Sequence, residues 1–270
     1  MMQFAEMQFA QIPGGRIEYR WIGPQDMDMP VLVFLHEGLG CVAMWRDFPD
    51  SVAAATGLPV LVYSRIGYGA SSPCALPRPI TYMHDDALIH LPHLLAALGI
   101  RCHILIGHSD GASIALIHAG SNPPPDLLGI AVMAPHSYGE AVSFGSIQAA
   151  HAAYATGDLR ARLAKYHGDN VDCAFRGWCD SWLNPDFGHW NIEAEVARIT
   201  LPVLAIQGEG DEYGTLRQIE TIKTLAKGRV ETLVLPQCGH SPHKDQPEAV
   251  CQAIAGFTAA LRRGMPPQGN

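Results

Sequence analysis

The stretch GHSDG at positions 107–111 separates a continuous apolar run at 103–106 from a small-residue helical pattern at 112–119. The run predicts a short buried strand, and the pattern after it predicts a helix. Ser109 then lies on a tight strand-to-helix corner, which directs its side chain outward and tolerates only small residues two positions before and after it. The two glycines of the stretch meet that requirement. Short Gly/Ser patterns also mark ordinary turns, so the rest of the chain has to decide whether Ser109 is reactive.

The composition limits the classes of protein and of partner. The chain has 270 residues, of which 48% are hydrophobic and 16% are charged, and this is typical of a folded globular protein with one domain or a domain and an insertion. Its net charge of -8 argues against non-specific binding to nucleic acid or anionic lipid, since both need a basic surface. No run approaches the roughly eighteen apolar residues of a membrane span. We therefore expect a small-molecule partner, and neither nucleic acid nor membrane.

The cysteines and the first residues bear on the cellular compartment. Seven cysteines are present, an odd number without a C-x-x-C pair, which favours reduced thiols. Residues 1–7 show neither the basic region nor the apolar core of a secretory signal. The sequence thus predicts a cytoplasmic protein, and it leaves open whether the protein is a monomer or a homo-oligomer.

Strand and helix patterns alternate along most of the chain. Most strand candidates are continuously apolar, as in strands that are buried on both faces of a parallel sheet. Because helical patterns lie between them, the sequence predicts an α/β fold with helices on both faces of a mostly parallel sheet. The first candidate alternates with period two and predicts an antiparallel edge strand. The candidate strands are 16–22, 31–35, 60–63, 103–106, 129–134, 202–207 and 230–235.

The alternation stops in one long stretch near the middle of the chain. This stretch has helix-like patterns, no strong strand signal and three of the five tryptophans. Trp178 and Trp182 are candidates for the wall of a pocket over Ser109, although such aromatic residues can equally form a small core of the stretch itself. The expected parts are an α/β core of 1–138 and 199–264, a helical cap insertion of 139–198 and a flexible tail of 265–270.

Three residues just beyond strand ends can form one reactive unit. A serine hydroxyl needs a base within reach, and that base needs an orienting carboxylate. Asp211 follows the strand at 202–207, and His240 follows the strand at 230–235. The carboxyl ends of parallel strands share one rim, so both residues can converge on Ser109. Their order along the chain is the one associated with a nucleophile elbow.

Neighbouring residues compete for two of these roles. Glu209 and Glu212 are rivals of Asp211 as the carboxylate, and His243 is a rival of His240 as the base. We prefer His240 because His243 lies deeper in the segment before the terminal helix. The preference for Asp211 depends on its loop position in the family resemblance given below.

Acyl transfer at Ser109 also needs donors for the developing oxyanion. The backbone amide of Asp110 follows the serine directly and can be one donor. The glycine turn after the strand at 31–35 can give the second, which we expect to be the amide of Gly38, with Leu39 as the alternative.

These motifs together resemble the α/β-hydrolase superfamily, in its capped form with a Ser-His-Asp triad. The resemblance spans nearly the whole chain. It implies an eight-stranded, mostly parallel sheet flanked by helices, a helical cap between the sixth strand and the strand that carries the acid, and catalysis without a metal or other cofactor. Its segments are the His-Gly oxyanion turn at 36–40, the arginine-glycine loop at 65–71, the elbow at 107–111, Asp211 and the Gly-His pair at 239–240.

Two acidic residues depart from the family pattern. Glu37 stands where the family usually has glycine, and Asp110 follows the serine where an apolar or amide residue is common. We expect both carboxylates to be held in ion pairs, for instance with Arg65. Unpaired carboxylates facing the pocket would disfavour an anionic substrate. Glu37 and His108 join Leu39 as candidate pocket residues.

The resulting expectation is a carboxylesterase-like serine hydrolase. Ser109 would attack a small carboxylic ester, thioester or lactone, with His240 as general base and acid and Asp211 orienting it. A carbon-carbon bond hydrolase of the meta-cleavage type would use the same triad, and a non-catalytic ligand-binding member of the fold is the alternative of another class. His90 and His93 lie one helical turn apart, but no third ligand is specified, so no metal site is expected.

Overall fold

The computed structural model describes residues 7–26, 28–121 and 123–263, and these form one eight-stranded sheet with the order β1-β2-β4-β3-β5-β6-β7-β8. β1 and β2 pair antiparallel, β2 is antiparallel to β4, and all other pairs are parallel. The predicted α/β fold class is confirmed. The strands are β1 (Gln8–Ile12), β2 (Gly15–Ile22), β3 (Val31–Leu35), β4 (Val60–Tyr63), β5 (His103–His108), β6 (Leu127–Met133), β7 (Val203–Gly208) and β8 (Val230–Leu235).

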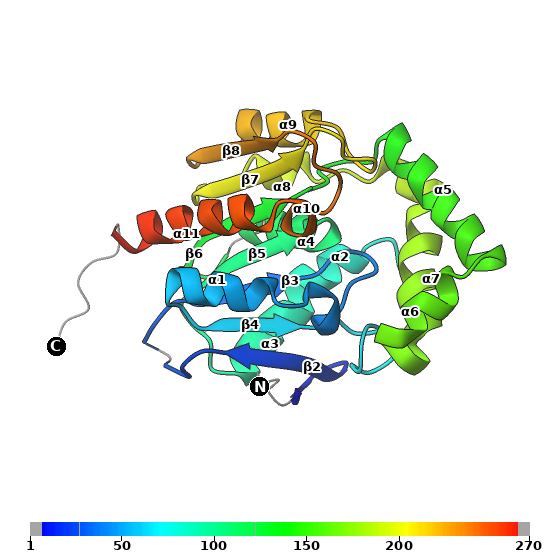
Figure 1. Cartoon of the computed structure of the whole chain (residues 1–270), viewed down its shortest axis with the longest axis horizontal. Helices are drawn as coiled ribbons and strands as arrows, with labels where there is room; N and C mark the ends of the chain where they lie inside the picture. The colour runs from blue at the N-terminus through cyan, green and yellow to red at the C-terminus, as the bar shows by residue number, and fades with distance from the viewer. Residues whose placement is uncertain (1–6, 27, 122, 264–270) are drawn as a thin grey trace.

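Helices cover both faces of the sheet. α1 and α11 pack against each other on one face, in front of the sheet in Figure 1, and α3, α4 and α9 cover the other face. The helices are α1 (Phe48–Thr56), α2 (Tyr82–Asp85), α3 (Leu91–Ala97), α4 (Asp110–Gly120), α5 (Ala141–Thr156), α6 (Leu159–His167), α7 (Val171–Trp182), α8 (Glu193–Val196), α9 (Arg217–Leu225), α10 (Pro242–Asp245) and α11 (Pro247–Arg263), with the short helical turns η1 (Val42–Trp45), η2 (Asp86–His90), η3 (Gly168–Asn170) and η4 (Pro185–His189).

The central strand β3 shows why the apolar runs form this sheet. Successive side chains of a strand point to opposite faces. Leu32 and Phe34 join the cluster under α1 and α11, whereas Val33 and Leu35 join the cluster on the opposite face. Each buried side chain of this size contributes about 1.5–3 kcal/mol to folding. A strand covered by helices on both faces therefore needs a continuous apolar run.

One expectation about local structure needs correction, and one segment departs from regular helix. The strand at 16–22 is not at the edge of the sheet, because β1 pairs outside it; β1 is only five residues long and its alternation was too short to predict a strand. The segment 81–98 forms α2, η2 and α3, and η2 is a wide π-type turn just before Pro92. Proline lacks the N–H that would continue the regular ladder, so the helix changes pitch there.

The stretch between β6 and β7 is helical. α5, α6 and α7 lie beyond the carboxyl ends of the parallel strands, at the right of Figure 1, whereas α8 packs on α4 and α9 beside the sheet. The division of the chain into a core and a cap domain stays a prediction, and the tail expected at 265–270 lies outside the described residues. No helix in the described ranges is long and apolar enough to cross a membrane.

Two residues of this insertion bind main-chain atoms of the rim. The N–H of Gly69 donates to His167 Nδ1 at 3.0 Å, and His167 Nε2 then donates to the carbonyl of Leu39 at 3.0 Å. Asn170 Nδ2 donates to the carbonyls of Gly69 and Ser71, at 3.1 and 2.6 Å. These hydrogen bonds fix the junction of α6 and α7 over the turns that follow β3 and β4.

Candidate active site

Ser109 lies on the corner between β5 and α4, with a backbone conformation of φ 53° and ψ -119°. This left-handed conformation is strained for a residue with a side chain and is typical of a nucleophile elbow. A Cβ atom at Gly107 would lie 2.4 Å from the carbonyl oxygen of Gly111, and one at Gly111 would lie 2.1 Å from that of Leu35. Only glycine at these two positions lets the corner form against β3.

His240 and Asp211 complete a hydrogen-bonded series with this serine. His240 Nε2 lies 2.9 Å from Ser109 Oγ, and His240 Nδ1 lies 2.8 Å from Asp211 Oδ1. Because the carboxylate accepts from Nδ1–H, Nε2 carries the lone pair and can accept the serine proton. The structure thus brings together three residues that are distant in the sequence.

The carboxylate of Asp211 is held by donors that sequence reasoning missed. Gln207 Nε2 donates to Oδ2 at 2.6 Å, and the amides of Tyr213 and Gly214 donate to Oδ1 at 2.8 and 3.1 Å. Burial alone would raise the pKa of Asp211, but the hydrogen bond and charge of His240 and the amide of Tyr213 outweigh it and lower the pKa. The residue is therefore an ionised and immobile partner for the histidine.

The residues that competed with Asp211 and His240 in the sequence do not take these roles. Glu209 is exposed, and Glu212 accepts a hydrogen bond from the backbone N–H of His240 at 3.2 Å. His243 is buried, and its ring packs on Trp45 with centroids 4.7 Å apart. Burial holds the pKa of His243 well below its ordinary value, so this side chain is a neutral core residue.

A pocket of about 190 Å³ opens in front of Ser109. Trp178 and Trp182 of α7 form part of its wall, so aromatic residues of the insertion do face the serine. All five residues expected at the pocket line it, namely Glu37, Leu39, His108, Trp178 and Trp182.

His136 also lines the pocket and was missed as a site residue. It follows the end of β6, and position after a parallel strand was the signal that could have found it. Its ring lies 5.8 Å from that of His240 and 5.3 Å from that of Trp182, between centroids. Burial and the neighbouring His240 lower the pKa of His136 to about 3, so it is neutral at neutral pH.

The turn after β3 carries one candidate amide for an oxyanion site. Arg65 Nη2 donates to the carbonyl oxygen of Glu37 at 3.0 Å, and His36 Nδ1 lies 2.7 Å from the same oxygen. The C=O and N–H of a planar trans peptide point in opposite directions, so these contacts direct the amide of Gly38 away from Arg65. Gly38 lines the pocket, and no described carbonyl accepts from its N–H.

The second candidate amide belongs to Asp110. This residue is the first of α4, where the N–H has no acceptor within the helix. It follows Ser109 directly and lines the pocket. The amide of Leu39, the alternative donor, also has no acceptor in the described part of the chain, but it lies one peptide further along the turn.

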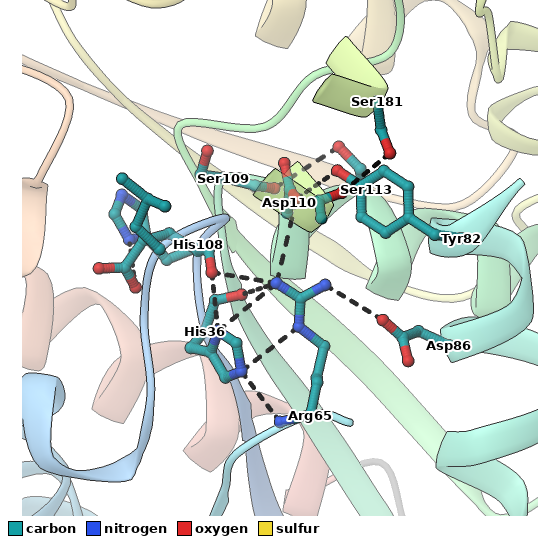
Figure 2. A network of polar contacts seen from close by, with 12 residues as sticks. His36, Arg65, Tyr82, Asp86, His108, Ser109, Asp110, Ser113 and Ser181 are labelled. Carbon is teal, nitrogen blue, oxygen red and sulfur yellow. Dashed lines mark hydrogen bonds and ion pairs between the residues drawn. The ribbon is translucent and has the colours of Figure 1, made fainter. Parts of the chain in front are cut away.

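The side chain of Asp110 joins a buried network around Arg65 (Figure 2). Arg65 Nη1 lies 3.1 Å from Asp86 Oδ2, and Nη2 lies 3.9 Å from Asp110 Oδ2. Tyr82 donates its hydroxyl to Asp110 Oδ2 at 2.5 Å, and Trp182 Nε1 donates to Asp110 Oδ1 at 3.2 Å. Burial raises the pKa of Asp110, although Arg65 and both hydrogen bonds oppose the rise. The expected pairing with Arg65 is present, and the same carboxylate anchors the pocket wall.

The carboxylate of Glu37 is held in an ion pair as expected, but its partner is Lys244 and not Arg65, the example given above. Its oxygens lie 3.6 Å from Lys244 Nζ and 3.5 Å from His108 Nδ1, while Arg65 reaches only the backbone carbonyl of Glu37. The turn that bears Glu37 faces α10, which carries the lysine, whereas Arg65 is already held by two aspartates. Burial would raise the pKa of Glu37, but His108 and Lys244 hold it well below its usual range.

Curated relatives match parts of the chain. Residues over 39% of this chain are 32% identical to a proline iminopeptidase of Levilactobacillus brevis, and 36% of it is 33% identical to an sn-1-specific diacylglycerol lipase of Danio rerio. The alignments cover 35% and 29% of those proteins, so they span about a third of the relatives' length.

Solved structures match nearly the whole chain. A haloalkane dehalogenase from Bradyrhizobium elkani has a TM-score of 0.75 at 19% identity, covering 96% of this chain and 99% of its own. An enol-lactonase from Burkholderia xenovorans has a TM-score of 0.72 at 19% identity, covering 93% of this chain and 100% of its own. At such identity, these likenesses show the fold alone.

A family model covers most of the sheet, the elbow and the loops that carry Asp211 and His240. It is the model of the alpha/beta hydrolase family, and it matches residues 32–253. The elbow geometry, the sheet order and this match agree, and the chain belongs to the alpha/beta hydrolase family.

Proposed function

We propose that this protein is a serine hydrolase that cleaves a small carboxylic ester, thioester or lactone through an acyl-enzyme on Ser109. The observation that carries the proposal is the series of two hydrogen bonds, 2.9 Å from Ser109 Oγ to His240 Nε2 and 2.8 Å from His240 Nδ1 to Asp211 Oδ1. This arrangement can activate a hydroxyl that is otherwise a weak nucleophile.

In the first half of the reaction, Ser109 Oγ attacks the carbonyl carbon while its proton passes to His240 Nε2. The imidazolium that forms is stabilised by the ionised Asp211. It then donates the proton to the leaving alcohol, thiol or ring oxygen as the carbon–heteroatom bond breaks. In the second half, His240 takes a proton from water, which attacks the acyl carbon and releases the acid and Ser109.

The amides of Gly38 and Asp110 would bind the oxyanion of both tetrahedral intermediates. Donors of this kind are effective because they are already oriented before the charge develops, and losing one typically costs about 2.7–4 kcal/mol. Arg65 and His36 would orient the amide of Gly38 for this role, since they bind the carbonyl of Glu37 on the opposite side of the same peptide.

The size and wall of the pocket support small acyl substrates. Its volume of about 190 Å³ is below the range of about 300–1,000 Å³ that is common for drug-sized ligands. The relatives named above include a lipase, a peptidase and a lactonase. From them we infer only that this fold accommodates several kinds of acyl chemistry.

The test is a panel of p-nitrophenyl esters and lactones of increasing acyl length, run with wild type and with Ser109→Ala. We expect Ser109→Ala to lose on the order of 10⁴-fold or more in kcat with an unchanged unfolding transition, and a fluorophosphonate probe to label wild type alone. Ser51→Ala, at an exposed serine of α1, should leave both readouts unchanged. Turnover that survives in Ser109→Ala would refute the proposal.

A further inference from the structure

Two cysteines meet where the insertion lies on the core. Cys74 is in the loop 64–81 that follows β4, and Cys173 is in the first turn of α7. Cys173 Sγ donates to the carbonyl oxygen of Cys74 at 3.4 Å, and Cys74 Sγ donates to that of Cys173 at 3.9 Å. Both residues are partly exposed. In the described part of the chain, no other thiol makes a hydrogen bond to a second cysteine.

This reciprocal contact is the arrangement that a disulfide needs. Each sulfur reaches the backbone of the other residue, so the two main chains approach closely and the side chains point toward one another. A disulfide closes when two such residues have α carbons about 4.4–6.8 Å apart and converging side chains.

The surroundings make the two sulfurs chemically unequal. Arg78 Nε donates to Cys74 Sγ at 3.2 Å, and reactive cysteines are commonly found beside a positively charged side chain. Arg78 is itself held by a hydrogen bond to the carbonyl of Ile66 and by the ring of Tyr68, 4.9 Å from its centroid. Burial raises the pKa of the Cys173 thiol. Cys74 is thus suited to react first and Cys173 to resolve.

An oxidant can reach the first sulfur. Cys74 lines a pocket of about 250 Å³ together with Arg78 and Tyr82. Cys41 and Cys179 are by contrast fully buried, and burial raises the pKa of each to about 12. Cys74 thus differs from these two buried thiols in its exposure and in its contact with a guanidinium.

We propose that Cys74 and Cys173 are a redox-reactive pair that closes into a disulfide and joins α7 covalently to the loop 64–81. With hydrogen peroxide as oxidant, the sulfur of Cys74 attacks one peroxide oxygen and the O–O bond breaks, which gives a sulfenic acid and water. The sulfur of Cys173 then attacks the sulfenic sulfur, forms the S–S bond and releases a second water. Two thiols are oxidised and one peroxide is reduced to two waters.

The bond would change how the pocket wall is held. α7 carries Trp178 and Trp182, which line the pocket in front of Ser109. The far end of α7 is fixed by the hydrogen bond from Trp182 to Asp110, and Asn170 holds its start by hydrogen bonds to the carbonyls of Gly69 and Ser71. A disulfide at Cys173 would add a covalent bond to these hydrogen bonds at the start of the helix.

The experiment treats the full chain with hydrogen peroxide and maps disulfides by mass spectrometry of a digest made without reductant. We expect a Cys74–Cys173 linkage, a rise of about 5 °C in Tm because the bond closes a long loop, and reversal of both by dithiothreitol. Cys74→Ser and Cys173→Ser should each abolish the linkage and the rise, and Cys251→Ser on α11 should retain both. The linkage map uses wild type, so it stands even if a variant fails to fold.

Two outcomes would overturn the proposal: oxidation of the chain without this linkage, or the linkage without a change in Tm. Arg78→Gln gives a further check, with an expected fall of at least fivefold in the rate of peroxide-driven closure, and an unchanged rate would contradict the role of Arg78. None of these readouts depends on hydrolysis, so the result is independent of the proposed function.

Discussion

The elbow on the sheet and the helical insertion above it are held by different kinds of contact. At the elbow, main chain meets main chain, since a Cβ at Gly111 would lie 2.1 Å from the carbonyl oxygen of Leu35. The insertion is held by side chains, such as Trp178 packed on Gly38 and Trp182 bonded to Asp110. Backbone contacts within a buried sheet cannot relax, whereas side-chain contacts can. We therefore expect an added side chain at the elbow glycines to prevent folding. Changes in the side-chain contacts of the insertion should alter the site while the fold persists.

Gly111→Ala should have the largest effect, because the added methyl group meets backbone that cannot move. We expect no cooperative unfolding transition and no hydrolysis, measured by circular dichroism and by the ester panel. Gly145→Ala on α5, where a Cβ meets nothing within 4 Å, should be neutral or stabilise by up to about 1 kcal/mol. A well-folded Gly111→Ala protein would contradict the expectation that main-chain contacts at the elbow cannot relax.

Arg65→Gln should come next. Asp110 would then be buried without its ion-pair partner, and Asp86 would keep only His90. Loss of one partner of a buried ion pair typically costs about 3–5 kcal/mol. Urea unfolding measures this directly. Arg160→Gln breaks an exposed pair with Asp172 on the insertion and should change stability little, since exposed pairs are screened by water. Equal losses of unfolding free energy in the two variants would contradict the expectation that the buried ion pairs of Arg65 stabilise the fold more than the exposed pair of Arg160.

Gly38→Ala tests the contact between the two regions. Its Cβ would lie 2.2 Å from the ring of Trp178, a side chain that can shift, so we expect the fold to persist while kcat/KM falls about 100-fold through displacement of the turn. The double variant Gly38→Ala/Trp178→Leu should recover part of the loss because the clash is removed. If the double variant is no better than the single one, the ring is not the cause.

The smallest effect concerns pH and the core. His103 is 1% exposed, and burial lowers its pKa to about 4. This histidine has a higher pKa in the unfolded chain than in the folded one. Its contribution to the free energy of unfolding is therefore complete above about pH 6.5 and is lost as the pH falls toward 4, at about 1.4 kcal/mol per pH unit. His103→Gln should therefore lose about 2 kcal/mol less than wild type between pH 6.5 and 5, measured by urea unfolding. Parallel pH profiles would exclude this histidine as a source of acid sensitivity.

The sequence predicted the regions whose structure is periodic or lies at strand ends. Continuous apolar runs located most strands, and the shared rim of parallel strands brought Asp211 and His240 to Ser109 as expected. The five-residue strand β1 escaped because its pattern was too short. The partner of Glu37 escaped because Lys244 lies on α10, more than two hundred positions away, and no local pattern specifies that packing. Single side-chain pairings across distant elements depend on the assembled fold.

The hydrogen bonds of His167 and Asn170 suggest a route for engineering. The hydrogen bonds of both side chains go to main-chain atoms of the core, at Leu39, Gly69 and Ser71, and the ring of His167 also contacts that of Tyr68. Main-chain donors and acceptors are the same whatever side chains the rim carries. A helical segment transplanted from another protein could therefore dock on this rim if it kept a histidine and an asparagine three positions apart at the same junction, which would allow the pocket wall to be exchanged as a module.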